Sequence, residues 1–483
     1  MFFRASLLTL TAIASASAAA ATSVSNVSFV NGITIAGNTL DLSSGSDFDR
    51  RVGFFSDIYY DRARNEWWGL SDRGPGGGTL PYETRVQRFT LDINANTGAI
   101  SNFKIQQTVK FTSASIALTG LAPDTPSLLG KSFDPEGIVV NPVTGNLLVS
   151  DEYGPSVYEF NRSGQLVRQY ATPANLVPKA GSSVNYNALA PAGSSPQLTS
   201  GREGNRGLEA LAITPDGRYA FAMLQNGTVT DGYDAASGTR GQYTRIVKYD
   251  TTTGEAVGQY AYQLNSSGQG RGISALVAID ANRFLVLERN NRGIGIGATV
   301  ASPDKNVFEV DLSTATDVSG LNLPASGLLP AGVIAAAKGA KVIDLDANTL
   351  AALGNKSPEK WEGLAIGPQL ANGKYVILAG TDNDYSVTQN GSGTQFDVYL
   401  DVTKSDPFAS SIQCPVGTTT GCFSTATSLG ATLTSAYQLL PGVLHSYTAD
   451  IAGYTAPVPE PETYAMLLAG LGVLAWARRQ RRA

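Results

Sequence analysis

The clearest pattern along the chain is a pair of short apolar runs that is repeated five times. In each copy a polar residue is followed by an apolar run of strand length, a turn of residues such as Pro, Asp, Asn and Gly, and a second apolar run that ends in polar residues. Two strands joined by such a turn form a β-hairpin. The five copies occupy residues 54–74, 133–154, 206–227, 271–293 and 360–384.

Further strand-like runs follow these hairpins, so each unit is predicted to have about four strands. The runs occupy residues 85–93, 156–160, 245–251, 306–312 and 396–402. Four-stranded units that recur every 65 to 88 residues are typical of a β-propeller, in which blades pack around a central axis. We therefore predict an all-β fold, a β-propeller with five recognisable four-stranded blades. A sixth blade is left open, because residues 27–42 and 436–451 would either build it or close the ring of five. A β-sandwich pair or a β-helix fits the spacing less well.

The polar residues that flank the hairpins are mostly acidic. In an antiparallel hairpin the first residue of one strand lies beside the last residue of the other. This rule predicts five opposing pairs, which are Asp57 with Asp72, Glu136 with Asp151, Glu209 with Leu224, Ser274 with Glu288, and Glu362 with Asp382. Because the innermost strands of a propeller all start around the same end of the axis, we expect these residues to meet at one mouth of the central channel.

That mouth would collect carboxylates and arginines. The candidate metal ligands are Asp57, Asp72, Asp151, Glu152, Glu288 and Asp382. The candidate substrate-binding residues are Arg73, Arg206, Arg271 and Arg289. Many carboxylates in one concavity repel each other unless cations neutralise them, and Ca²⁺, with its oxygen ligands, suits such a place. We therefore expect Ca²⁺ as the cofactor and an anionic small molecule as the substrate.

The same segments resemble a known family. The runs DPEGIVV, GLEALAITPDGRYAF, ISALVAIDANRFLVLERN and WEGLAIGP are similar to those of the family named for the esterase-like activity of phytase. The similarity spans roughly residues 30–450. It implies a phytase-like propeller that hydrolyses phosphoric or other esters. The residues carried over from the matching motifs are Glu136, Glu209 and Glu362, with a catalytic role inferred for each.

Two other interpretations of these glutamates and of the fold remain open. Glu136, Glu209 and Glu362 would serve packing if they accept backbone N–H groups of the next blade or pair with Arg206 and Arg271. Alternatively, the protein is a non-catalytic propeller that binds extracellular polysaccharide or protein at the cell surface.

Both ends of the chain predict export. Residues 1–21 run from Arg4 through an apolar stretch into small residues, which is the order of a secretory signal peptide. Residues 457–483 contain Pro-Glu-Pro, an uncharged segment at 463–477 and four arginines, and they resemble a PEP-CTERM sorting signal. That resemblance implies processing by an exosortase-type enzyme of a Gram-negative bacterium, and delivery of a propeller domain at 25–456 to the cell envelope or the outside.

The uncharged segment at 463–477 is short for a membrane helix, which needs about 20 residues. The four arginines that follow this segment are nevertheless typical of a chain end that stays on the cytoplasmic side of a membrane. We expect a short transmembrane segment that holds the chain in the membrane before processing, with a plain membrane anchor as the alternative.

Composition narrows the functional classes. Without residues 1–21 and 478–483 the chain keeps 30 basic against 40 acidic residues, a net charge of −10 that argues against nucleic-acid binding. The single histidine, His445, argues against histidine-based catalysis. Cys414 and Cys422 frame a Gly/Thr loop, which in an oxidising compartment predicts a local disulfide, with two idle thiols as the alternative.

Overall fold

The computed structural model describes residues 23–457, apart from gaps at 188–196, 235–236, 267, 269–270, 298, 391–392, 425–426 and 430–432. The predicted signal peptide and the uncharged segment at 463–477 lie outside the described residues. Within them the helical elements are short, namely α1 (Asp47–Arg50) and the 3-10 turns η1 (Leu345–Ala347), η2 (Ala351–Leu353) and η3 (Asp384–Ser386). A search of this part of the chain finds no helix with the length and apolar character needed to cross a membrane.

Five four-stranded antiparallel sheets make up the body of the described chain. The first holds β2 (Asp57–Asp61), β3 (Glu66–Leu70), β4 (Arg85–Ile93) and β5 (Ile100–Lys110). The second holds β8 (Pro135–Val140), β9 (Leu147–Asp151), β10 (Val157–Phe160) and β11 (Leu166–Gln169). The third holds β14 (Leu208–Ile213), β15 (Tyr219–Leu224), β16 (Tyr243–Asp250) and β17 (Ala256–Gln263). The fourth holds β18 (Gly272–Ala278), β19 (Arg283–Arg289), β20 (Lys305–Asp311) and β21 (Ala337–Asp344).

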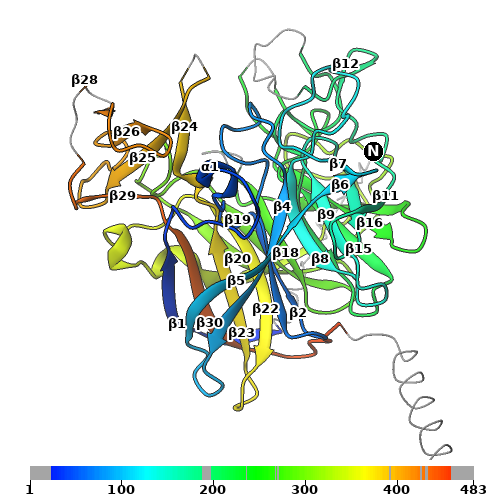
Figure 1. Cartoon of the computed structure of the whole chain (residues 1–483). Helices are drawn as coiled ribbons and strands as arrows, with labels where there is room; N and C mark the ends of the chain where they lie inside the picture. The colour runs from blue at the N-terminus through cyan, green and yellow to red at the C-terminus, as the bar shows by residue number, and fades with distance from the viewer. Residues whose placement is uncertain are drawn as a thin grey trace, which may run out of the picture.

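The fifth sheet is built from both ends of the described chain. Its strands are β22 (Trp361–Gln369), β23 (Tyr375–Thr381), β30 (Gly442–Ile451) and β1 (Val24–Ile35), in that spatial order. Figure 1 shows the blue β1 beside β30, with the yellow β23 and β22 next to them. Residues 27–42 and 436–451 therefore contribute the strands that close the ring, and the described residues contain no sixth blade.

The five sheets form a closed ring around the channel. The first strand of each sheet contacts the first strand of the next, in the order β2, β8, β14, β18, β22 and back to β2. Five apolar clusters lie at the five boundaries. At one of them Trp68 of β3 packs with Ile138 of β8, and at the closing boundary Ile58 of β2 packs with Leu378 of β23. Burial of apolar residues between every pair of neighbours is what holds a propeller together.

The strand at residues 396–402 was predicted to extend the fifth blade, and this prediction is wrong. It forms β25 (Gln395–Asp401), the centre of a separate sheet inserted between β23 and β30. The other strands of this insertion are β24 (Val387–Gln389), β26 (Ile412–Pro415), β27 (Phe423–Ser424), β28 (Thr427–Leu429) and β29 (Tyr437–Leu439). In Figure 1 the insertion is the orange group at the upper left. Two small hairpins, β6 (Thr112–Ser113) with β7 (Ile116–Ala117) and β12 (Lys179–Ala180) with β13 (Ser183–Val184), complete the strands.

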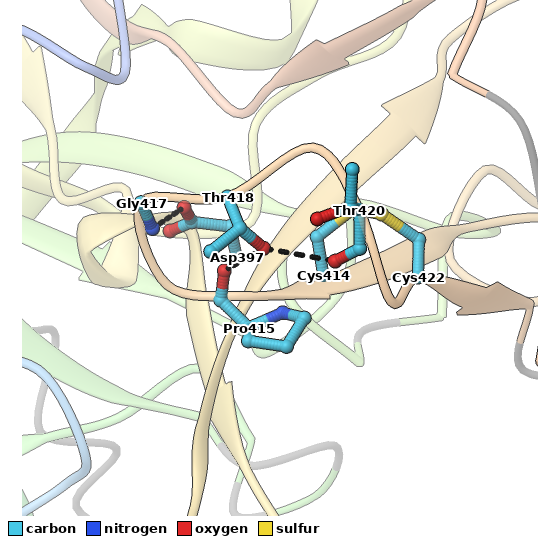
Figure 2. The surroundings of a disulfide bond; sticks show 7 residues. All are labelled: Asp397, Cys414, Pro415, Gly417, Thr418, Thr420 and Cys422. Atoms are coloured by element: carbon cyan, nitrogen blue, oxygen red, sulfur yellow. Dashed lines mark hydrogen bonds between the residues drawn. A yellow bond between two sulfur atoms is a disulfide. The ribbon is translucent and has the colours of Figure 1, made fainter.

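The predicted disulfide between Cys414 and Cys422 is confirmed, and it lies in this insertion. Figure 2 shows the loop that it closes, where the Thr418 hydroxyl donates to the carbonyls of Pro415 and Thr420. The Asp397 carboxylate accepts the Gly417 N–H at 2.9 Å.

The predicted hairpin partners are offset because of β-bulges. Pro135 rather than Glu136 lies opposite Asp151, and Leu208 rather than Glu209 lies opposite Leu224. In the same way Ile273 lies opposite Glu288, and Trp361 lies opposite Thr381. Each of these four hairpins has a register shift at the start of its inner strand, which places an extra residue there. The first hairpin has no shift, and Asp57 lies opposite Leu70.

Candidate functional site

A cavity of about 230 Å³ lies where the inner strands β8, β14 and β22 begin. We call it the mouth cavity. Nine of the thirteen residues predicted as site residues line it. They are Asp72, Arg73, Glu136, Glu152, Arg206, Glu209, Arg289, Glu362 and Asp382.

The three glutamates carried over from the family motifs reach the cavity because of the bulges. Glu136, Glu209 and Glu362 are each the second residue of an inner strand and lie at its register shift. A bulge breaks the alternation of the strand and re-aims one side chain, which is a common arrangement beside functional sites. The three equivalent side chains thus face the same space from three blades.

One wall of the mouth cavity belongs to the second blade. Oxygens of Asp134, Glu136 and Glu152 lie within 4.8 Å of one another, and all three residues are buried. Arg73 Nη1 lies 2.7 Å from Asp134 Oδ2 and 3.5 Å from Glu152 Oε2, and it also donates to the Asn205 side chain. Glu152 Oε1 is buried and has no hydrogen-bond partner. We call Asp134, Glu136 and Glu152 the acidic triad.

The opposite wall is a chain of hydrogen bonds and ion pairs. Arg206 donates to Gln225 Oε1, and Gln225 Nε2 donates to Glu209 Oε1 at 2.7 Å. Arg289 binds Glu362 through Nη2 and donates from Nε to the Ser274 hydroxyl at 2.7 Å. Among the described residues, Arg73 and Arg289 form ion pairs with carboxylates, whereas Arg206 forms none.

The third wall belongs to the fifth blade and is centred on Lys360. Lys360 Nζ lies 2.9 Å from Asp382 Oδ2 and 2.6 Å from Asp384 Oδ1. Asp72, which follows β3, also lines this side, and its Oδ1 accepts the Gly74 N–H at 2.9 Å.

Burial sets the protonation of the cavity. Burial raises the pKa of Glu136, Glu209 and Asp72 well above the ordinary value, and neighbouring carboxylates raise it further. Burial also raises the pKa of Glu152 and of Asp382 to about 7, although Arg73 and Lys360 respectively oppose the shift. Burial and mutual repulsion thus disfavour the charged form of these carboxyl groups, and a bound cation would favour it.

The other four predicted site residues lie outside the mouth cavity. Asp57 accepts the N–H of Ile138 in the neighbouring blade, and so it ties two blades together. Asp151 accepts the N–H groups of Asp134, Tyr153 and Gly154, which shapes the loop after β9.

Arg271 and Glu288 pair with each other, with Nη1 and Oε1 3.2 Å apart. Glu288 also binds Lys338 Nζ at 2.7 Å and the Tyr262 hydroxyl at 3.1 Å. Arg271, Glu288, Asp57 and Asp151 thus make contacts within and between blades and do not line the mouth cavity.

Five residues of the mouth cavity, and Asp134 behind it, were not predicted. The five are Asn205, Gln225, Asn291, Glu359 and Lys360. A sequence signal was available for two of these six residues, since Asp134 stands two residues before Glu136 and Lys360 stands two residues before Glu362. In an extended chain, side chains two residues apart share a face.

The fold and the cavity together define a β-propeller of five blades with a charged cavity at one mouth. The family model for the esterase-like activity of phytase matches residues 50–385, so the chain belongs to this family. The model of the PEP-CTERM protein-sorting motif matches residues 457–482. The protein is therefore exported to the cell envelope or the extracellular space of a bacterium, and its sorting motif implies recognition by an exosortase-type enzyme.

Similar proteins carry little functional information. An uncharacterized secreted protein of Arthroderma benhamiae is 26% identical over an alignment of 410 residues, and the match covers 68% of this chain and 79% of the relative. A putative 6-phosphogluconolactonase from Bacteroides uniformis has a TM-score of 0.28 and 12% identity, and the match covers 74% of this chain and 83% of the lactonase chain. Hydrazine synthase of Kuenenia stuttgartiensis has a TM-score of 0.27 and 12% identity, and the match covers 77% of this chain and 68% of the synthase chain. These low scores say nothing about the site.

Proposed function

We propose that the protein is a calcium-dependent hydrolase of phosphoric esters and that the mouth cavity is its active site. The family to which the chain belongs is named for the esterase-like activity of phytase. The observation that carries the proposal is the acidic triad, three buried carboxylates with oxygens within 4.8 Å of one another, beside a cavity that also contains Arg206.

The acidic triad fits a hard divalent cation. Carboxylate oxygens are the ligands that Ca²⁺ prefers. Glu152 Oε1 is a buried acceptor without a partner, and among the described residues no hydrogen bond or ion pair reaches the Glu136 carboxylate. When bound there, Ca²⁺ would supply Lewis-acid polarisation of a phosphoryl oxygen and a more acidic water.

The arginines of the opposite wall would bind the anionic substrate. Arg206 has no carboxylate partner among the described residues, so its guanidinium is available for a phosphate. Arg289 is held by Ser274 and by Glu362, which fixes its direction. Acidic residues alone would repel a phosphoester, and these two arginines reduce that repulsion.

Glu209 is the residue to which we assign proton transfer. Glu136 belongs to the acidic triad, and Arg289 binds Glu362 more closely than Glu209, whose Oε1 lies 3.9 Å from Arg289 Nη2. The Glu209 carboxyl is oriented by Gln225, and its pKa is raised by burial and by Glu152 and Glu362. A carboxyl group with a raised pKa is suited to protonate the leaving oxygen.

The first experiment measures melting temperature and the hydrolysis of p-nitrophenyl phosphate by the exported protein, in Ca²⁺ and in a chelator. We expect Ca²⁺ to stabilise the protein by RT ln(1 + [L]/Kd), about 2.7 kcal/mol at a hundredfold excess over Kd, and hydrolysis to require Ca²⁺. Glu136→Gln keeps the size of the side chain, and it should lose most of both effects. Glu255→Gln makes the same change at an exposed turn and should lose neither.

Two outcomes contradict the proposal. Equal melting with Ca²⁺ and with chelator would remove the metal site. Calcium binding without hydrolysis of any phosphoester would leave a calcium-binding propeller in place of an enzyme.

A further inference from the structure

A second acidic group lies at the edge of the mouth cavity, on the side of the fifth blade. Asp382 and Asp384 lie within 3 Å of Lys360 Nζ, at 2.9 and 2.6 Å. This acidic group therefore already surrounds a positive charge that belongs to the chain.

The acidic triad differs in this respect. Among the described residues, the cation that forms ion pairs with it is Arg73, whose Nη1 is engaged by Asp134 and by the Asn205 side chain. Arg73 approaches Glu152 only to 3.5 Å, and Glu152 Oε1 is left without a donor. One acidic group thus encloses its own cation, whereas the other has a buried acceptor that no protein group satisfies.

We propose that Lys360 is a resident cation that takes the place of a second divalent ion, so that the mouth cavity binds one calcium ion, at the acidic triad. This inference rests on the metal site of the proposed function. It assigns Asp382, predicted from the sequence as a metal ligand, to the lysine instead.

A lysine in this place also offers a contact to the substrate. An ammonium group has three N–H donors, and among the described residues Asp382 and Asp384 account for two. The Lys360 side chain is 23% exposed and lines the cavity, so the third donor is within reach of a bound phosphate. The fifth blade would then supply positive charge to the substrate without a metal.

The test is the calcium stoichiometry of the exported protein, measured by isothermal titration calorimetry. We expect one calcium ion per wild-type chain. Lys360→Met removes the charge and keeps most of the length, so Asp382, Asp384 and Asp72 are left to face each other, and we expect two calcium ions per chain. Lys360→Arg keeps the charge, and we expect one.

The outcomes separate this inference from the proposed function. Two ions bound by the wild-type protein, or one by a folded Lys360→Met variant, would overturn the role of Lys360 and leave the metal site intact. No ion bound by any of the three proteins would overturn both. If Lys360→Met does not fold, anomalous scattering from Tb³⁺ in wild-type crystals decides, because a peak between Asp382 and Asp384 contradicts the inference and a single peak at the acidic triad supports it.

Discussion

His445, the single histidine of the chain, is buried in β30 and takes no part in the mouth cavity. Its ring packs against Trp361 and Phe29, with centroids 4.6 and 5.0 Å away. Nε2 is buried without a partner, and Nδ1 lies 3.4 Å from the Tyr447 hydroxyl. Burial lowers the pKa of His445 to about 4. The histidine is thus a packed core residue, held neutral in the folded protein.

Because the pKa of His445 is depressed, we expect this one residue to make the folded protein less stable in acid. An unfolded histidine has a pKa of about 6.5, so the unfolded chain binds more protons than the folded one between pH 6.5 and about 4. Protonation of His445 therefore has little effect on the free energy of unfolding above pH 6.5. As the pH falls below this value, the free energy of unfolding decreases, by about 2 kcal/mol at pH 5. His445→Leu should remove this loss. Urea unfolding at pH 7.5 and pH 5.0 checks it, and an equal change for both proteins would contradict the prediction.

At the scale of single residues, the sequence predicted the acids of the mouth better than their partners. Glu136, Glu209 and Glu362 stand at repeated positions, and nothing but the repeat was needed to place them together. Lys360 and Gln225 do not repeat, and their importance depends on which carboxylates their side chains reach across the cavity. Such contacts are set by the three-dimensional packing of the blades, and the spacing of residues along the chain does not predict them.

At the scale of strands, the bulges set the hairpin register and the insertion sets the pairing of β25, and the pattern of apolar residues predicted neither. A bulge adds one residue to one strand, so a hairpin rule based on counting from the turn misplaces Glu209 by one position. The strand β25 has the apolar alternation of a blade strand, yet it pairs with β26 of the insertion. The sequence pattern identifies a strand, but the strand with which it pairs depends on which later segment of the chain packs beside it.

The insertion is joined to the propeller by a buried ion pair. Arg51 lies between α1 and β2, and it binds Asp397 of β25 through both terminal nitrogens. The two side chains are 6% and 1% exposed. Asp397 also accepts the Gly417 N–H of the loop closed by the disulfide (Figure 2). One carboxylate therefore holds the disulfide loop and the body of the protein together.

Asp397→Asn tests this connection. The amide keeps the shape but leaves the buried Arg51 charge unpaired, which costs about 3 to 5 kcal/mol. We expect a lower melting temperature and faster proteolytic cleavage within residues 387–439. Asp406→Asn changes an exposed carboxylate of the same insertion and should shift the melting temperature by no more than a degree or two. Equal proteolysis of both variants would show that the ion pair does not fasten the insertion.

At the scale of the whole molecule, the two ends of the propeller channel differ. The mouth is lined by charged residues. The opposite end encloses about 40 Å³ of space lined largely by apolar residues, among them Ile213 and Ile366, and Tyr454 and Pro457 also line it. The matched sorting motif begins at residue 457, so the chain leaves the propeller at the end away from the proposed active site. Removal of the sorting signal should therefore leave the mouth cavity unchanged.

Two truncations test this separation of the ends. A chain that stops after Pro457 keeps the Tyr454 ring on Tyr375, with centroids 4.9 Å apart, and the Thr455 N–H bond to the Ile279 carbonyl. It should melt at the temperature of the longer protein. A chain that stops after Ala452 loses these contacts and the Arg62 guanidinium over the Tyr454 ring, and it should be less stable by about 1 to 3 kcal/mol. Because the contacts lie away from the mouth, both chains should gain the same melting temperature from Ca²⁺. A calcium response that disappears in the shorter chain alone would show that the two ends are coupled.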